Sequence, residues 1–145
     1  MGTKSNIHQL NSYLRGEISA VETYKMALEK IDYTSPLRAD VEANLRSHEE
    51  RVVMLRDCIL QLGGDPATTS GPWGVFAKAV EGTARTMGDK MAISALEEGE
   101  DHGVADYKRG LDDLDPDSRV LVTSQLMPLQ QQSHGRMSGL KHRLS

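Results

Sequence analysis

Apolar residues recur along much of the chain at alternating spacings of three and four, which is the pattern of helices that bury one face in a bundle. Stripes of this kind cover residues 10–31, 41–62 and 93–114, and a fourth helix is expected over about 118–143. Sustained alternation with a period of two is absent, so the sequence gives a β-rich fold little support. The prediction is an all-α protein, an antiparallel four-helix bundle.

Breaks in the pattern mark the expected connections. Pro36 ends the first helical region, and Gly63-Gly64-Asp65-Pro66 is a strong terminator after the second. Pro72 is a suitable first residue for a short extra helix between helices 2 and 3. Pro128 should bend the fourth helix, because it lacks a backbone donor and crowds the carbonyl of Ser124. The short extra helix would be built from Trp73, Val75, Phe76, Ala79 and Val80.

Composition narrows the class of protein. A length of 145 residues fits a single domain over 1–145, and only 4% of residues are aromatic, so the core must be mainly aliphatic. A net charge of −4 argues against nucleic-acid or anionic-membrane partners. The single cysteine, Cys58, excludes a disulfide within the chain. No apolar run resembles a membrane span or a signal peptide, and we expect a cytoplasmic protein.

The first and third helices contain an internal repeat. Residues 16–28 align without gaps on residues 99–111, and six of the thirteen positions are identical. The offset from Glu17 to Glu100 is 83 residues, and the same offset carries His48 to Gln131 and Arg51 to His134. The sequence therefore predicts a duplicated helical hairpin, with one copy over about 5–64 and the other over about 88–144.

Polar residues interrupt the apolar stripes near their middles. Buried carboxylates are costly unless they are paired, protonated or bound to metal, and carboxylate and imidazole groups are ligands for iron, manganese and zinc. We expect these side chains to converge at the bundle centre, with Tyr24 and Tyr107 two turns from Glu17 and Glu100. The candidate ligands are Glu17, His48, Glu97, Glu100, Gln131 and His134.

The segment 10–24, in which Glu17 is followed seven residues later by Tyr24, resembles the first helix of bacterioferritins and of the wider ferritin-like superfamily. Gly99-Glu100-Asp101 and a segment containing Trp73 make the chain most similar to small bacterial ferritin-like four-helix-bundle proteins of unknown function. Ferritin-like di-iron proteins use one Glu from each of two helices and a Glu-x-x-His from each of the other two. By this resemblance Glu17 and Glu100 match the single carboxylates and His134 matches the fourth-helix histidine.

Three positions depart from that pattern. His48 replaces the second-helix Glu, Arg51 replaces its His, and Gln131 replaces the fourth-helix Glu. Arg51 would place a permanent positive charge beside a second metal, or would pair with Glu97 or Glu100. In this view Tyr24, Arg51 and Tyr107 surround the ligands without binding metal themselves.

Two hypotheses follow for function. In the first, the centre binds iron, or manganese or zinc, and the resemblance implies oxidation chemistry or a role in stress. In the second, the same residues form a metal-free buried network, and the protein acts by oligomerisation or partner binding. Whether the chain is an enzyme is left open. A homo-oligomer is expected in either case, but not a large iron-storage shell, because the chain leaves no room for an additional C-terminal helix.

Overall fold

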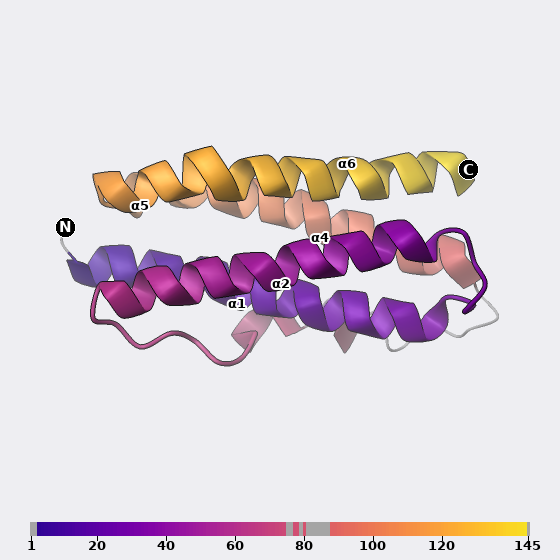
Figure 1. Ribbon diagram of the computed structural model, residues 1–145, viewed down its shortest axis with the longest axis horizontal. Coiled ribbons are helices and arrows are strands. Elements are labelled where there is room, and N and C mark those ends of the chain that lie inside the picture. Colours follow the sequence, from indigo (N-terminus) through magenta and orange to yellow (C-terminus); the bar gives the residue numbers. More distant parts are fainter. Residues whose placement is uncertain (1–2, 75–76, 79, 81–87, 145) are drawn as a thin grey trace.

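The computed structural model describes residues 3–74, 77–78, 80 and 88–144. Four long helical rods lie side by side (Figure 1), and the described ranges contain no strand. The predicted all-α four-helix bundle is confirmed. The rods are α1 (Thr3–Lys30), α2 (Arg38–Gln61), α4 (Gly88–Gly110) and a fourth rod that joins α5 (Pro116–Leu121), a π turn (Val122–Leu126) and α6 (Met127–Leu144).

Short polar connections join the rods within each hairpin. Between α1 and α2, the Asp32 carboxylate accepts a hydrogen bond from the Thr34 amide (3.0 Å), and Arg38 donates to the carbonyls of Leu28 (2.9 Å) and Ile31 (3.1 Å). The two Arg38 bonds satisfy carbonyls that the end of α1 would otherwise leave without partners. A 3₁₀ turn (Leu111–Asp113) and Asp115 connect α4 to α5.

The second connection is much longer than the other two. Helix α2 ends at the predicted terminator, where Gly63 has φ +80°, a conformation that suits glycine. The chain then runs back along the outside of the bundle (Figure 1), so that α2 and α4 point in the same direction. A 3₁₀ turn (Gly71–Gly74) lies where a short helix was expected to begin at Pro72, and Val80 is buried. The expected helix residues Val75, Phe76 and Ala79 lie outside the described residues.

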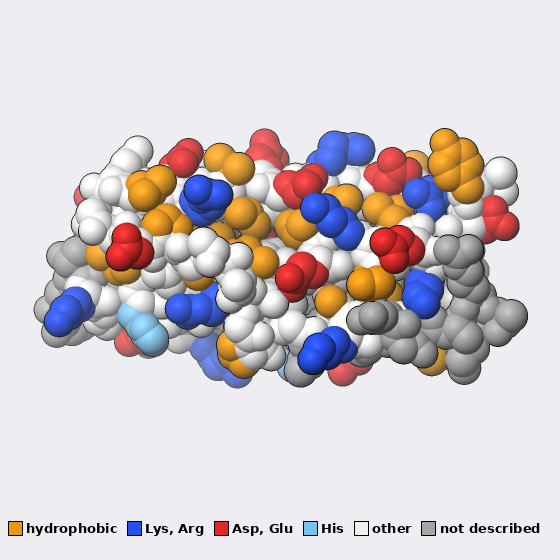
Figure 2. All heavy atoms as spheres, turned by 90° about the horizontal axis from the view of Figure 1, so that it is seen from below, with side chains coloured by type: hydrophobic (Ala, Val, Ile, Leu, Met, Phe, Trp, Pro, Cys, Tyr) orange, Lys and Arg blue, Asp and Glu red, His pale blue; other side chains and the backbone are white. Residues whose placement is uncertain are grey.

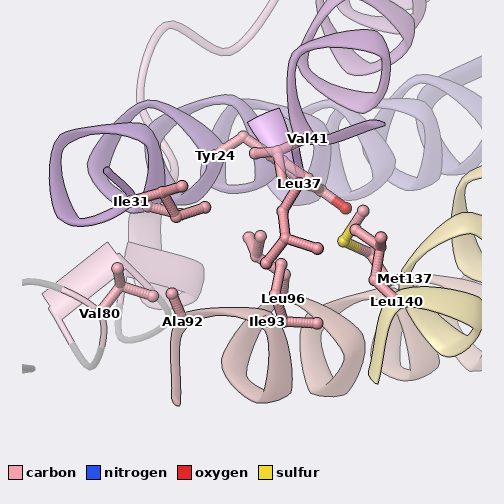
Figure 3. Packing of buried hydrophobic residues seen from close by; sticks show 11 residues of the cluster. Tyr24, Ile31, Leu37, Val41, Val80, Ala92, Ile93, Leu96, Met137 and Leu140 are labelled. Carbon is pink, nitrogen blue, oxygen red and sulfur yellow. The ribbon is translucent and has the colours of Figure 1, made fainter. Parts of the chain in front are cut away.

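The core consists of two mainly aliphatic clusters with a polar layer between them. One cluster occupies the end near the α1–α2 loop and includes Ile31, Val41, Ile93 and Leu140 (Figure 3). The other occupies the opposite end. Its buried members are Leu10, Tyr13, Leu14, Leu55, Ile59, Tyr107, Leu114, Val122 and Leu126. All four rods pass through both clusters, so each must cross the polar layer at its middle.

The surface mixes charge with apolar side chains. On the face shown in Figure 2, acidic and basic side chains are interspersed along the molecule, with apolar side chains between them. Within the described ranges, no helix combines the length and apolarity needed to cross a bilayer.

Candidate functional site

The polar layer is built from ionisable side chains on three of the rods and amide and hydroxyl groups on the fourth. Helix α1 contributes Glu17, α2 contributes His48 and Arg51, and α4 contributes Glu100; all four are buried. The Arg51 side chain has no exposed surface. Because charged groups are expensive to bury, each must find its counter-charge and hydrogen-bond partners within the layer.

His48 lies between the two carboxylates. Its Nδ1 is 2.5 Å from Glu17 Oε1, and its Nε2 is 2.7 Å from Glu100 Oε2. An ionised carboxylate only accepts hydrogen bonds, so both ring nitrogens must carry a proton to satisfy these contacts. The geometry therefore assigns an imidazolium that bridges Glu17 and Glu100.

The pKa values of the three groups agree with this assignment. Burial opposes the charged form of His48, but Glu100 and Glu17 outweigh it and the His48 pKa is raised. Burial likewise opposes ionisation of Glu17, yet the charges of Arg51 and His48 lower its pKa to about 2. The pKa of Glu100 is also lowered, because His48 overcomes the effect of burial. The ionised forms thus stabilise one another.

Arg51 supplies a second buried cation. Its Nη1 lies 3.3 Å from Glu17 Oε2 and also donates to Gln130 Oε1. Its Nη2 donates to Ser133 Oγ at 2.9 Å and to Ser47 Oγ at 3.1 Å. Two carboxylates, one imidazolium and one guanidinium give the layer a net charge of zero.

Two tyrosines complete the carboxylates' hydrogen bonds. Tyr24 donates to Glu100 Oε2 at 2.6 Å, and Tyr107 donates to Glu17 Oε2. Burial and the adjacent carboxylates raise the pKa of both hydroxyls, so they remain protonated donors. Glu100 Oε1 accepts from Gln130 Nε2 (2.9 Å) and from Ser133 Oγ (2.6 Å). Within the described part of the chain, no buried side-chain nitrogen or oxygen lacks a partner.

The structure thus brings together six of the nine residues singled out from the sequence: Glu17, Tyr24, His48, Arg51, Glu100 and Tyr107. The first of the three that lie elsewhere is Glu97. It contacts Ser138 (2.9 Å) and Lys141 (2.9 Å) at the edge of the bundle, and Leu96 takes the inner position. Leu96 and Glu97 both fit the spacing of the stripe between Ile93 and Glu100. Leu96 takes the buried position because burying a glutamate costs much more solvation free energy than burying a leucine.

Gln131 and His134 also lie outside the layer. Gln131 is exposed, and His134 pairs with Asp101 near the surface, with His134 Nε2 2.5 Å from Asp101 Oδ1. Gln130 and Ser133 face inward instead. The repeat offset of 83 residues is therefore one residue too long for this helix, because His48 and Arg51 correspond to Gln130 and Ser133. A helix turns about 100° per residue, so this difference places Gln131 and His134 off the inner face.

A π turn precedes these inner residues. The Met127 amide donates to the Val122 carbonyl, five residues back, just before Pro128. Pro128 was predicted to disturb this helix, and the disturbance takes the form of a local widening. The sequence did contain a signal for the inner face, because Leu126, Gln130, Ser133, Met137 and Leu140 follow four-three spacing. Asn44 and Ser47, which also line the layer, have no such signal.

A cavity of about 60 Å³ adjoins the cluster between α1 and α4. Small residues of both helices, Gly16, Ala20, Gly99 and Gly103, line it beside Glu17 and Glu100. A buried water needs roughly 10–15 Å³ of such space, so the cavity has room for a few small molecules.

The residues of the layer do not fit a metal centre in this arrangement. The imidazole uses opposite nitrogens for the two carboxylates, so one ion could not touch both glutamates and the histidine unless the ring were displaced. The Arg51 guanidinium is a further cation at Glu17. Among the described residues, no group of three or more His, Cys, Asp or Glu side chains is arranged to hold a metal ion.

Comparisons with known proteins bear on the fold. No protein-family model matches the sequence, and no curated protein matches it. A solved crystal structure from Bacillus anthracis str. Ames, described as ferritin like, diiron-carboxylate proteins, is similar over 100% of both chains, with a TM-score of 0.77 and 19% sequence identity. The order of helices, the long second connection and this full-length similarity lead to one conclusion: the chain has the ferritin-like fold.

Proposed function

We propose that this chain is a ferritin-like bundle whose centre works without metal and which acts by associating with copies of itself or with a partner protein. The observation that carries the proposal is the position of His48, whose imidazolium lies between Glu17 and Glu100. In ferritin-like di-iron proteins the carboxylates neutralise metal ions. Here His48 and Arg51 provide the neutralising charges.

The polar groups of this centre satisfy one another. Both tyrosine hydroxyls and every carboxylate oxygen already hold a hydrogen bond within the layer. The contacts tie all four rods together, since α6 joins through Gln130 and Ser133. A cluster of this kind supports a structural role at the middle of the bundle.

Association has a candidate surface on α2. Val53 and Leu60 lie seven residues apart and are 56% and 55% exposed, so they share one outer face of the helix. A two-fold dimer would bury this face against itself, because an isologous interface uses the same patch on both subunits. We infer a homo-oligomer and, from the composition, a cytoplasmic location.

The metal-independent centre is tested on protein purified without chelator. Elemental analysis should find no stoichiometric iron, manganese or zinc. Thermal melts under anaerobic Fe(II), or with Mn(II) or Zn(II), should leave Tm unchanged, since a ligand that binds only the folded state raises it. Retained metal, or a rise in Tm that Glu17→Ala removes and Glu97→Ala does not, would overturn the proposal.

A metal-binding centre is the second candidate. Glu17 and Glu100 face one another across His48, and the fold is shared with a protein described as a diiron-carboxylate protein. Iron, or manganese or zinc, would require the His48 ring to move, and the cavity between α1 and α4 offers space beside it. This candidate predicts proton release on addition of Fe(II), because the imidazolium must lose its bridging proton. Isothermal titration in two buffers of different ionisation enthalpy measures that release.

A further inference from the structure

The Glu100 carboxylate accepts a full set of hydrogen bonds within the polar layer. An ionised carboxylate offers about four lone-pair sites to donors. On Glu100, each of the two oxygens accepts two hydrogen bonds. The donors are Gln130 and Ser133 on Oε1, and Tyr24 and His48 on Oε2. Glu100 therefore has no site for a further donor.

The Glu17 carboxylate accepts one hydrogen bond fewer. Its Oε2 accepts from Arg51 and from Tyr107. Among the described residues, its Oε1 accepts from His48 alone. One acceptor site on Glu17 Oε1 is thus available to a group from outside the layer.

The cavity between α1 and α4 lies directly beside this carboxylate. Glu17 lines the cavity together with Gly16 and Ala20 of α1, and Gly99 lines it from α4. A Cβ built on Gly16 would have no atom within 4 Å, so the space at this point of α1 is open. The carboxylate with the available site therefore borders a small space whose walls at these positions are glycine and alanine.

We propose that this cavity is a binding site for a small neutral alcohol. The hydroxyl of the ligand donates a hydrogen bond to Glu17 Oε1, and its short apolar body packs against Gly16, Ala20 and Gly99. The inference rests on the proposed metal-independent centre, because that centre keeps Glu17 ionised without a metal ion. It adds a ligand that the centre itself does not require.

The size of the cavity limits the ligand. Its volume of about 60 Å³ is well under the roughly 150 Å³ of an apolar cavity that holds benzene. The ligand therefore has about three or four non-hydrogen atoms, as in ethanol or a propanol.

The charges of the polar layer decide which class of small molecule fits. A cationic ligand at Glu17 would lie beside the His48 imidazolium and the Arg51 guanidinium, which already neutralise the layer. An anionic ligand would face the Glu17 carboxylate itself. Either ion would bring an uncompensated charge into a buried space, which is costly. A neutral donor avoids this cost.

The test is a titration of the unmodified protein with ethanol, followed in amide proton–nitrogen correlation spectra. Gly16, Gly99 and Gly103 line the cavity and act as reporters, whereas Gly135 lies on the exposed side of α6. The three reporter signals should shift and reach saturation, and the Gly135 signal should stay in place. The Kd should lie in the millimolar range, because a ligand of about three non-hydrogen atoms can gain little binding free energy.

Ligands of similar size test the chemical class. Acetonitrile is neutral but has no O–H or N–H donor, ethylammonium is a cation, and acetate is an anion. Ethanol should bind at least about tenfold more tightly than acetonitrile, because acetonitrile cannot make a hydrogen bond to the charged acceptor. Ethylammonium and acetate should give no saturable shift of the three reporters.

A pair of variants locates the site. Ala20→Leu extends the α1 wall into the cavity and should abolish the shifts that ethanol causes. Ala105→Leu adds the same apolar group at an exposed position of α4 and should leave the Kd for ethanol unchanged. Circular dichroism checks that both variants are helical. Ethanol binding by a folded Ala20→Leu with an unchanged Kd would overturn the assignment of the cavity.

The titrations of the unmodified protein decide the matter even if Ala20→Leu does not fold. Equal binding of ethanol and acetonitrile would contradict the hydrogen bond to Glu17, and saturable binding of ethylammonium would contradict the neutral class. No saturation up to about 200 mM ethanol, or an equal shift of Gly135, would overturn the site.

Elemental analysis of the same sample separates this inference from the proposed function. A metal-free sample without saturable ethanol binding overturns the alcohol site alone. Stoichiometric iron, manganese or zinc in the sample would instead contradict the metal-independent centre.

Discussion

At the scale of single residues, His48 is central. Among the described residues of the layer, it is the one side chain that hydrogen-bonds to both Glu17 and Glu100. Its ring is buried, and its two nitrogens are used on opposite sides. Without it, two ionised carboxylates would face one another in a space of low polarity, which is a strongly unfavourable arrangement.

Replacing His48 by alanine should therefore lower the free energy of unfolding by about 3–5 kcal/mol, the usual cost of breaking a buried ion pair. His134→Ala is the matched control. It removes a histidine paired with Asp101 near the surface, and such pairs contribute at most about 1 kcal/mol. Urea denaturation at pH 6 measures both losses. Equal losses for the two variants would contradict the bridging role of His48.

Free imidazole offers a second test of the same residue. In His48→Gly the vacated space adjoins the cavity between α1 and α4, so an added imidazole can reach Glu17 and Glu100. We expect millimolar imidazole to raise the Tm of His48→Gly and to leave that of His134→Gly unchanged. No difference between the two variants would indicate that His48 contributes only by filling space.

The stability of the protein should fall at both ends of the pH range. The His48 pKa is raised in the folded protein, so its contribution is complete below about pH 6.5 and is lost as pH rises through the folded value. The Glu17 pKa is lowered to about 2, so its contribution is complete above its usual value of 4.5 and is lost as pH falls.

Urea denaturation from pH 3 to pH 10 checks this profile. His48→Gln carries no titrating proton, so the decline on the alkaline side should be absent from that variant. Persistence of the same decline in His48→Gln would assign it to other groups.

At the scale of whole elements, a π turn in the fourth rod directly precedes α6, whose buried side chains face the centre. The four helical regions, the terminator at Gly63 and the inner positions of Glu17 and His48 could be predicted, because they depend on local spacing and turn chemistry. The inner positions of α6 could not be taken from the repeat, since a single residue of offset separates Ser133 from His134. Likewise, only packing distinguishes Leu96 from Glu97 on α4.

Helix α4 also approaches α6 closely enough to require glycine. A Cβ built on Gly103 would lie 2.4 Å from Gln130 Nε2, whereas one built on Gly16 of α1 would have no atom within 4 Å. Gly103→Ala should destabilise the protein, because Gln130 cannot move without leaving Arg51 and Glu100. Gly16→Ala should stabilise it by roughly 0.5–1 kcal/mol through helix propensity. Thermal melts of the two variants should therefore shift in opposite directions; a shift of Gly103→Ala toward higher Tm would contradict the close approach.

At the scale of the whole molecule, the aliphatic clusters at the two ends resemble those of any helical bundle, and the stripes alone predicted them. The polar layer depends on contacts between residues as far apart in sequence as Glu17 and Tyr107. Sequence spacing indicated that these residues would meet. It could not show that an imidazole would lie between the carboxylates, because that depends on which side chains fill the centre in three dimensions.

The assembly state is the prediction that belongs at this scale. Light scattering should give a mass of at least twice the 16.0 kDa of the chain. Val53→Glu together with Leu60→Glu should give a monomer with unchanged helicity, because both side chains lie on the exposed face of α2. Val120→Glu, another exposed apolar position, is the control and should leave the mass unaltered. A monomeric unmodified protein would contradict self-association.

The polar layer also limits how the rods can slide along one another. Aliphatic side chains pack nearly as well after a shift of one helical turn, about 5.4 Å, because one leucine or isoleucine replaces another. The same shift would separate the His48 imidazolium from Glu17 or Glu100 and bury unpaired charges against hydrocarbon. The charged middle of the bundle thus excludes shifted arrangements of the rods that the apolar clusters at its two ends would tolerate.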